Sequence, residues 1–121
     1  MNPSYKTVDG KIKQAIRAVE CGKIYLLDQD VIAADLLDLG VEIGGISALL
    51  LEILQKISPR HYEGTHPPQK SYKAPILECE LYAFVVELKS KGCFVYLKFA
   101  IKNNFLWLVS LHENRPAGKE Y

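Results

Sequence analysis

Hydrophobic and polar residues alternate through most of the last third of the chain, and this alternation predicts β-strands. Residues 93–112 read CFVYLKFAIKNNFLWLVSLH, with large apolar side chains at every second position before and after Asn103 and Asn104. Successive side chains of a strand point to opposite faces, so one face of each strand is expected to be buried. We therefore predict two strands that meet at the asparagines.

The register of these two strands decides which side chains share a face. A two-residue turn at the asparagines would pair Lys102 with Phe105 and mix the apolar and polar rows. A three-residue loop over residues 102–104 instead pairs Ile101 with Phe105, and asparagine tolerates the left-handed conformation that such a loop needs. We therefore expect the three-residue loop. Its buried row contains Val95, Leu97, Phe99, Ile101, Phe105, Trp107, Val109 and Leu111.

The opposite face of this hairpin gathers polar groups that can take part in chemistry. In the three-residue register Tyr96 lies directly across from Ser110, and Lys98 and His112 share their face. The sequence therefore predicts a phenol, a hydroxyl, an ammonium group and an imidazole on one small patch of the sheet.

Three helices are predicted before this hairpin, because apolar residues there recur at intervals of three and four. They cover residues 11–21, 31–39 and 46–57, and Asp28 or Asp30 is the expected N-cap of the second one. The third helix is apolar around most of its circumference and should pack against the sheet.

A further strand is predicted at residues 80–88, and residues 23–27 form a short extended connector. Three helices followed by three consecutive strands indicate an α+β fold, with the N-terminal helices packed on one face of an antiparallel sheet. The other face is left to solvent or to a ligand. At 121 residues the chain suffices for one domain, with loose ends expected at residues 1–7 and 114–121.

Charge and cysteine content narrow the class of protein. The formal net charge of +1 gives no global field of the kind that marks nucleic-acid-binding proteins, although a local basic patch is compatible with it. The three cysteines have no metal-ligand spacing and are expected to be reduced. Residues 1–11 lack the apolar core of a signal peptide, and the apolar run at 46–51 is too short to span a bilayer. We expect a cytoplasmic protein with no membrane partner.

The segment at residues 58–79, between the third predicted helix and the strand predicted at residues 80–88, carries further polar side chains. His61, Tyr62, Gln69 and Lys70 lie in it, and long ordered loops in compact domains are often functional. Together with the patch on the sheet, these groups suit cleavage of RNA without a metal. A base takes the 2′-OH proton, cations stabilise the charged phosphorane, and an acid protonates the leaving 5′ oxygen, while aromatic rings stack the bases.

Two histidines in this segment leave a zinc site as an alternative. His61 and His66 stand five residues apart, and His112 would be the third ligand. A fourth ligand is not evident, so we expect no metal and no cofactor. A zinc-dependent hydrolase is the less favoured hypothesis.

Three short motifs give the chain a resemblance to a known family. They are His61-Tyr62 after the last helix, Tyr96-Leu97-Lys98 on one strand and Ser110-Leu111-His112 on the next. In these motifs, and in element order over about residues 10–113, the chain resembles the MqsR toxins of the RelE-like superfamily. The resemblance implies an mRNA interferase, a hydrolase of a type II toxin–antitoxin system that a cognate antitoxin protein holds inactive.

The resemblance also implies roles for individual residues. Tyr96 matches a tyrosine of the family's active site, Tyr62 matches the tyrosine of its Phe-Tyr-Lys-Ser motif, and His112 matches the basic residue that ends the last strand. Glu63 stands where the family has a lysine, and Lys98 or Lys70 would supply the missing cation. We thus expect His112, Lys98, Tyr96 and Tyr62 to be catalytic, and RNA to be bound by Lys70, His61, Gln69 and Ser110.

The sequence also leaves open a homodimeric assembly and a function other than catalysis. The chain is also compatible with a homodimer. The alternative to catalysis is a non-catalytic protein-binding module of the same fold, in which Leu106, Leu108 and Phe94 on the open face contact the partner.

Overall fold

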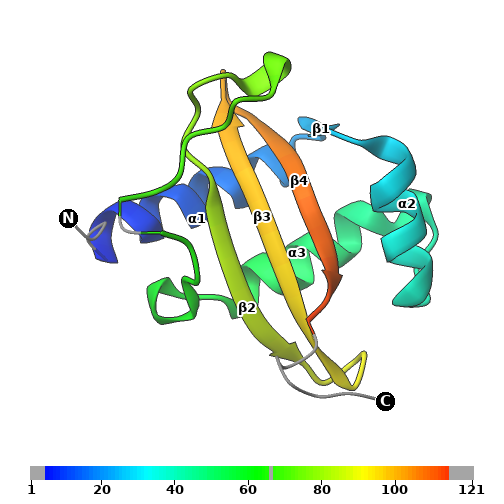
Figure 1. The fold of residues 1–121 in the computed structure, drawn as a ribbon. Helices are drawn as coiled ribbons and strands as arrows, with labels where there is room; N and C mark the ends of the chain where they lie inside the picture. Colours follow the sequence, from blue (N-terminus) through cyan, green and yellow to red (C-terminus); the bar gives the residue numbers. More distant parts are fainter. Residues whose placement is uncertain (1–4, 66, 115–121) are drawn as a thin grey trace.

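The computed structural model describes residues 5–65 and 67–114, which form an α+β fold of helices and one four-stranded sheet (Figure 1). The helices are α1 (Tyr5–Glu20), α2 (Gln29–Asp38) and α3 (Ile46–Lys56). The strands are β1 (Ile24–Leu26), β2 (Tyr82–Leu88), β3 (Cys93–Lys102) and β4 (Phe105–Glu113). Figure 1 shows α1 and α3 crossing behind the sheet, with α2 beside β4. The predicted fold class is confirmed.

The three helices lie where the spacing of apolar residues predicts them. Helix α1 begins at Tyr5, ahead of the expected start at residue 11, so the loose arm expected for residues 1–7 does not extend over residues 5–7. The expected N-cap of α2 is present, because the side chain of Asp28 accepts a hydrogen bond of 3.2 Å from the Val31 N–H. Among the described residues, every helix is too short or too polar to traverse a lipid bilayer. Residues 1–4 and 115–121 lie outside the described part of the chain.

The sheet has a fourth strand that the sequence interpretation took for a connector. Its order is β1-β4-β3-β2, and β1 runs parallel to β4, so the sheet is mixed rather than wholly antiparallel. Two hydrogen bonds of 2.9 Å extend the ladder, from the Leu27 N–H to the Leu108 carbonyl and from the Leu106 N–H to the Lys23 carbonyl. A three-residue strand is enough here, because it occupies an edge that β4 would otherwise expose to solvent.

The β3–β4 hairpin has the two-residue turn, and the prediction of a three-residue loop is wrong. Lys102 pairs with Phe105, and both Asn103 and Asn104 have positive φ angles, of 53° and 66°. Such angles belong to the two-residue turn whose twist matches that of the strands. Further along, the register shifts between Lys98 and Phe99.

In a regular hairpin with a two-residue turn, apolar residues of β4 would be divided between the two faces of the sheet. The register shift changes which residues of β4 face the core. Phe99 is paired with Leu108 but Lys98 with Ser110, so Val109 is the extra residue of a bulge. As a result Leu106 and Leu108 face the main core ahead of the bulge and Leu111 faces it beyond the bulge. Phe105 and Trp107, which were expected in the buried row, lie on the opposite face.

Hydrophobic cores form on both faces of the sheet. The main core lies between the helices and one face, and there Tyr82, Phe84 and Leu88 of β2 are buried as predicted. A second, smaller cluster of Ile76, Leu81 and Ala100 covers part of the other face, with Trp107 and Val109 packed against it. The face expected to be open is therefore partly covered by the segment that precedes β2.

This covering segment is held by turns and hydrogen bonds rather than by a long strand. The chain between α3 and β2 contains two turns of 3₁₀ helix. Pro59–His61 contacts α1, whereas Ala74–Ile76 lies in the part that covers the sheet, where Ile76 is buried. The Lys102 ammonium donates a hydrogen bond of 2.7 Å to the Pro75 carbonyl, which ties the segment to the end of β3. We call the face of the sheet away from the helices the outer face. Among the described residues, this segment leaves it accessible beyond the cluster of Ile76, Leu81 and Ala100.

Candidate functional site

Tyr96 and His112 form the centre of the candidate site on the outer face of the sheet. They are cross-strand partners in β3 and β4, and their ring centroids are 5.2 Å apart with an interplanar angle of 21°. The Lys98 Nζ atom lies 5.9 Å from the centroid of the Tyr96 ring, and Lys98 itself pairs with Ser110. All four residues are half-buried. The expected patch is therefore present, although His112 and not Ser110 lies across from Tyr96.

The tautomer of the His112 imidazole follows from its backbone contact. Its Nδ1 atom lies 2.8 Å from the carbonyl oxygen of Glu113. Because a carbonyl oxygen can only accept, Nδ1 carries a proton in this contact, and in the neutral ring the lone pair is then on Nε2. With the ring plane held against Tyr96, His112 has a fixed orientation and one nitrogen that can take a proton.

Acidic residues surround one side of His112. Asp35, Asp38 and Glu113 line a hollow of about 320 Å³ together with His112. Asp35 and Asp38 were not among the predicted site residues, because their proximity to His112 depends on the packing of α2 against β4. Their negative charge disfavours a phosphate group on this side, so an anionic ligand would have to approach from the side of Lys98.

A second hollow lies next to Lys98 and is formed by the covering segment. It measures about 160 Å³ and is lined by Leu27, Gln69, Ser71, Tyr72, Lys73, Leu81, Lys98 and Val109. Gln69, one of the predicted RNA-binding residues, thus lines the same hollow as Lys98. The hydroxyl of Ser71, a buried residue, accepts a hydrogen bond of 3.1 Å from the Lys73 N–H, which shapes this wall of the hollow.

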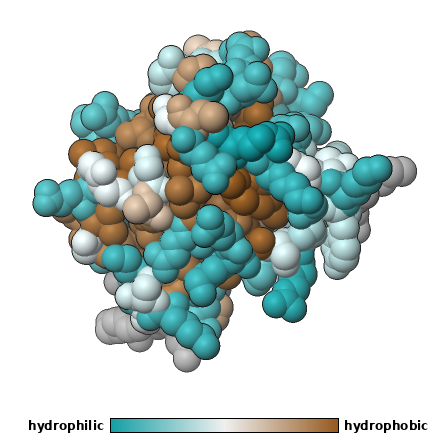
Figure 2. All heavy atoms as spheres, turned by 180° about the vertical axis from the view of Figure 1, so that it is seen from behind, coloured by the Kyte–Doolittle hydropathy of each residue, from teal (hydrophilic) through white to brown (hydrophobic). Residues whose placement is uncertain are grey.

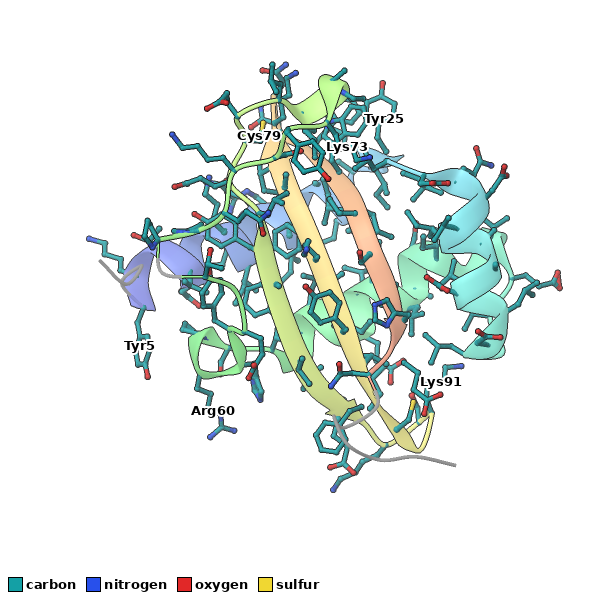
Figure 3. The ribbon with its side chains drawn as sticks, viewed as in Figure 1. Tyr5, Tyr25, Arg60, Lys73, Cys79 and Lys91 are labelled. Atoms are coloured by element: carbon teal, nitrogen blue, oxygen red, sulfur yellow. The ribbon has the colours of Figure 1, made fainter. Side chains whose placement is uncertain are left out.

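Tyr72 and Lys73 are functional candidates that were not among the predicted site residues. The Tyr72 side chain is 77% exposed, and the Lys73 Nζ atom lies 5.6 Å from the centroid of its ring. Figure 3 shows Lys73 in front of the sheet, on the side that carries the candidate site. The available signal was the alternation of aromatic and basic residues in QKSYK, which is typical of surfaces that bind single-stranded nucleic acids.

Tyr62 is placed away from the Tyr96–His112 pair. It forms an isolated bridge with Phe84, and its ring packs against those of Tyr82 and Phe84, which face the main core. Its hydroxyl donates a hydrogen bond of 2.7 Å to the Thr65 carbonyl. Burial, and to a lesser degree the charge of Glu80, raises the pKa of Tyr62 above its ordinary value. A catalytic role for Tyr62 beside His112 is therefore not supported by its position.

His61 and Lys70 are likewise outside the patch formed by Tyr96, Lys98, Ser110 and His112. The His61 Nδ1 atom accepts a hydrogen bond of 2.9 Å from the Ser58 N–H, which caps the short 3₁₀ turn. Lys70 is exposed and forms an isolated bridge with Glu80 ahead of β2. Of the eight predicted site residues, five are gathered around one part of the outer face: Tyr96, Lys98, Ser110, His112 and Gln69.

The zinc alternative finds no support in the described part of the chain. Within residues 5–65 and 67–114, no three histidine, cysteine or acidic side chains are close enough together to hold one metal ion. His61 uses Nδ1 to cap a turn and His112 stacks on Tyr96. His66, the remaining predicted ligand, lies outside the described residues.

Comparisons with known proteins assign no family. No protein-family model matches the sequence, and a search of curated proteins found no match. The likeness to the MqsR toxins therefore rests on the three short motifs given above.

Proposed function

We propose that the protein is a metal-independent endoribonuclease that cleaves RNA by attack of a 2′-OH group. The observation that carries this proposal is the His112 imidazole stacked on Tyr96, with the Lys98 ammonium over the same ring. This arrangement combines an imidazole that can transfer protons, a cation and an aromatic surface within one patch. The likeness to the MqsR motifs agrees with it.

The proposed reaction needs two proton transfers and charge stabilisation. Nε2 of neutral His112 takes the proton of the 2′-OH as this oxygen attacks the adjacent phosphorus. The bond from phosphorus to the 5′ oxygen breaks, and that oxygen takes up a proton from a protonated group or from water. The products are a 2′,3′-cyclic phosphate and a 5′-OH end, so no external oxidant or reductant enters the balance.

Lys98 and its neighbours supply the positive charge for the phosphorane. Lys98 lies between the Tyr96 ring and the hollow that Gln69 and Lys73 also line. A phosphate at this place is on the side of His112 away from Asp35 and Asp38, where the cations stabilise its developing charge. Tyr96 would orient His112 and stack a base, and Ser110 would donate to the RNA.

We further propose that the enzyme is the toxin of a type II toxin–antitoxin system and acts in the cytoplasm. This step depends on the likeness to the MqsR family, whose members cut mRNA and are neutralised by an antitoxin protein. Induced expression in a bacterial host should arrest growth and degrade mRNA, while the His112→Ala variant should do neither.

Cleavage by the purified protein tests the proposed chemistry directly. With EDTA present, single-stranded RNA should be cut to products that carry 2′,3′-cyclic phosphate, and a 2′-deoxy substitution at the cut position should block cleavage there. His112→Ala should lower the rate by about 10²–10⁴-fold, which is the usual contribution of a general acid or base. Glu87→Gln, an exposed change in β2, is the matched control. Equal rates for the parent and His112→Ala would refute the assignment.

Non-catalytic protein binding is the second candidate, and of the three residues first expected to contact the partner, Phe94 is 48% exposed and stays available for it. Leu106 and Leu108 are fully buried in the main core and cannot contact a partner, so that part of the hypothesis is wrong. The observation in its favour is on the helical side, where apolar side chains lie at the centre of the surface (Figure 2). Val31 and Leu37 of α2 are also exposed. Loss of partner capture in Leu37→Asp, without RNA cleavage by the parent, would favour this function.

A further inference from the structure

A stack of three aromatic rings lies at the end of the sheet where β1 joins β4. Tyr25 is paired with Trp107, and its ring centroid is 4.6 Å from that of Trp107 and 4.7 Å from that of Phe105. Tyr25 and Phe105 are nearly parallel, with an interplanar angle of 15°. Even so, the Tyr25 side chain is 48% exposed. The ring is therefore held in place by its neighbours while part of its surface remains in water.

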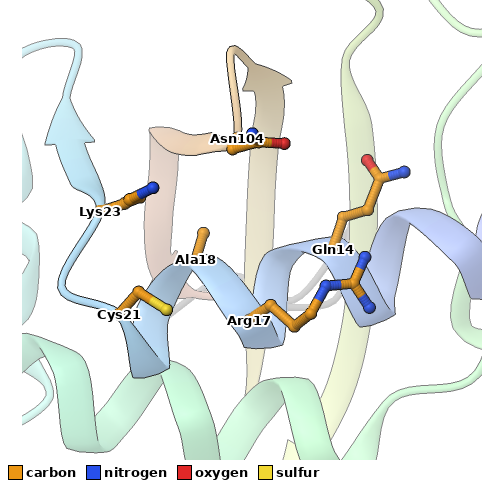
Figure 4. Close-up of a pocket in the computed structure, with 6 residues that line it drawn as sticks. All are labelled: Gln14, Arg17, Ala18, Cys21, Lys23 and Asn104. Carbon is orange, nitrogen blue, oxygen red and sulfur yellow. The ribbon is translucent and has the colours of Figure 1, made fainter.

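A pocket with cationic and amide side chains in its lining lies next to this aromatic stack. It has a volume of about 290 Å³ and is lined by Gln14, Arg17, Ala18, Cys21, Lys23 and Asn104. Figure 4 shows Arg17 and Gln14 on α1 and Lys23 and Asn104 on segments facing that helix. The Lys23 Nζ atom lies 5.9 Å from the centroid of the Phe105 ring, so the same lysine borders both the pocket and the stack.

The lining of this pocket favours an anion. Two cationic side chains and two amides face the hollow, and none of the six described residues that form it is a carboxylate. Such a set binds phosphate through charge and hydrogen bonds. Lys23 also borders the Phe105 ring of the aromatic stack. Aromatic rings combined with cationic groups are the means by which proteins hold single-stranded nucleic acids.

We propose that this end of the sheet is a second contact for single-stranded RNA, in which a base stacks on Tyr25 and a neighbouring phosphate lies between Arg17 and Lys23. The inference rests on the proposed ribonuclease function and adds a place for nucleotides remote from the cut. Phe105 and His112 are on the same face of β4, roughly 20 Å apart at the usual rise per residue. One strand of several nucleotides can thus contact both places, passing Tyr72 and Lys73.

The experiment measures binding without cleavage. A fluorescein-labelled 2′-O-methyl RNA of mixed sequence, 12 nucleotides long, is titrated with the full-length protein by fluorescence anisotropy at several salt concentrations. Tyr25→Leu, which keeps apolar bulk but removes the ring, should weaken binding about tenfold and leave the salt dependence unchanged. Tyr25→Phe should bind like the parent, which shows that the fold and the stack are intact.

The contributions of Arg17 and Lys23 are tested through the salt dependence of RNA affinity. Arg17→Gln and Lys23→Gln should each lower the slope of log affinity against log salt by about 0.7, the value for one phosphate contact with a single strand. Tyr5→Leu and Lys56→Gln, exposed residues on α1 and α3, are the matched controls and should behave like the parent. Figure 3 shows Tyr5 far from Tyr25.

The outcomes separate this inference from the cleavage proposal. If the parent binds the RNA and none of the changes at Tyr25, Arg17 and Lys23 alters affinity or salt slope, the second contact is refuted, whether or not unmodified RNA is cut. Absence of binding by the parent refutes it as well. If binding depends on these residues but unmodified RNA stays whole, the RNA contact stands and the cleavage proposal falls.

Discussion

The imidazole of His112 lies against the phenol ring of Tyr96, with 5.2 Å between the ring centroids. A second contact, from Nδ1 to the Glu113 carbonyl, holds the same ring from its edge. Two contacts of different kinds therefore fix both the plane and the tautomer of one histidine. In the proposed reaction this orientation would lower the entropy cost of proton transfer, because the lone pair on Nε2 points in one direction before RNA binds.

This relationship predicts that the ring of Tyr96 matters more than its hydroxyl. Tyr96→Phe keeps the stack and should retain kcat for RNA cleavage within a few-fold of the parent. Tyr96→Leu removes the stack and should lower kcat by about tenfold or more while KM changes less, because misorientation affects the reaction more than binding. Steady-state kinetics on a short RNA would measure both values. A loss in Tyr96→Phe as large as in Tyr96→Leu would instead assign a direct role to the hydroxyl.

The segment that covers the outer face and contains Ile76 gives a prediction about stability. Ile76 is fully buried, whereas the next residue, Leu77, is 56% exposed. Ile76→Ala should lower the free energy of unfolding by about 2–5 kcal/mol, the usual range for removing a buried aliphatic side chain. Leu77→Ala is the matched control and should change it by less than about 0.5 kcal/mol. Urea denaturation would compare them, and similar losses for both would show that the cover does not pack as described.

Much of the fold follows from the spacing of apolar residues, but the faces of β4 do not. Residues 105–109 are all apolar, so alternation cannot tell which of them are inside. The prediction rejected the two-residue turn because a regular hairpin would then have mixed the rows. A bulge at Val109 removes that conflict. The signal that could have decided the matter was Asn103-Asn104, since both positions of the tight hairpin turn need positive φ, which asparagine tolerates.

The candidate site was predictable where it depends on one hairpin and not where it depends on tertiary packing. Tyr96, Lys98, Ser110 and His112 share a face in either register, because the bulge lies between them and the turn. Two of the acids beside His112, Asp35 and Asp38, come from α2, and the stack around Tyr25 requires β1 to join the sheet. Tyr62 was expected at the site from the resemblance, but its pairing with Phe84 points it to the core side.

The turn itself offers a test of the observed register. Asn104 has a φ angle of 66°, which glycine adopts freely but residues with a Cβ atom adopt at a cost of about 1–2 kcal/mol. Asn104→Ala should therefore lower the free energy of unfolding by about 1 kcal/mol, whereas Asn104→Gly should match or exceed the parent. Chemical denaturation of the two variants would test this. Greater stability of Asn104→Ala than of Asn104→Gly would contradict a left-handed conformation at this position.

Tyr82 predicts how stability changes in alkali. Burial, then the hydrogen bond to Glu80 and the charge of Glu80, raise the pKa of Tyr82 above its ordinary value. The Tyr82 hydroxyl donates to Glu80 Oε1 over 3.0 Å. In the unfolded chain a phenol loses its proton near pH 10, so above that pH the unfolded state binds fewer protons than the folded state. The contribution of Tyr82 is thus complete below about pH 10 and is lost as the pH rises further.

Tyr82→Phe should make this alkaline loss of stability less steep, because the group that titrates differently in the two states is gone. Urea denaturation between pH 8 and about 11 would give the slope for the parent and the variant. At neutral pH the variant should lose only about 0.5–1.5 kcal/mol, the usual value of one hydrogen bond. Tyr72→Phe removes an exposed hydroxyl and serves as the control. Suppose that Tyr72→Phe reduced the slope of unfolding free energy against pH as much as Tyr82→Phe did. The effect would then not arise from the buried phenol and its contact with Glu80.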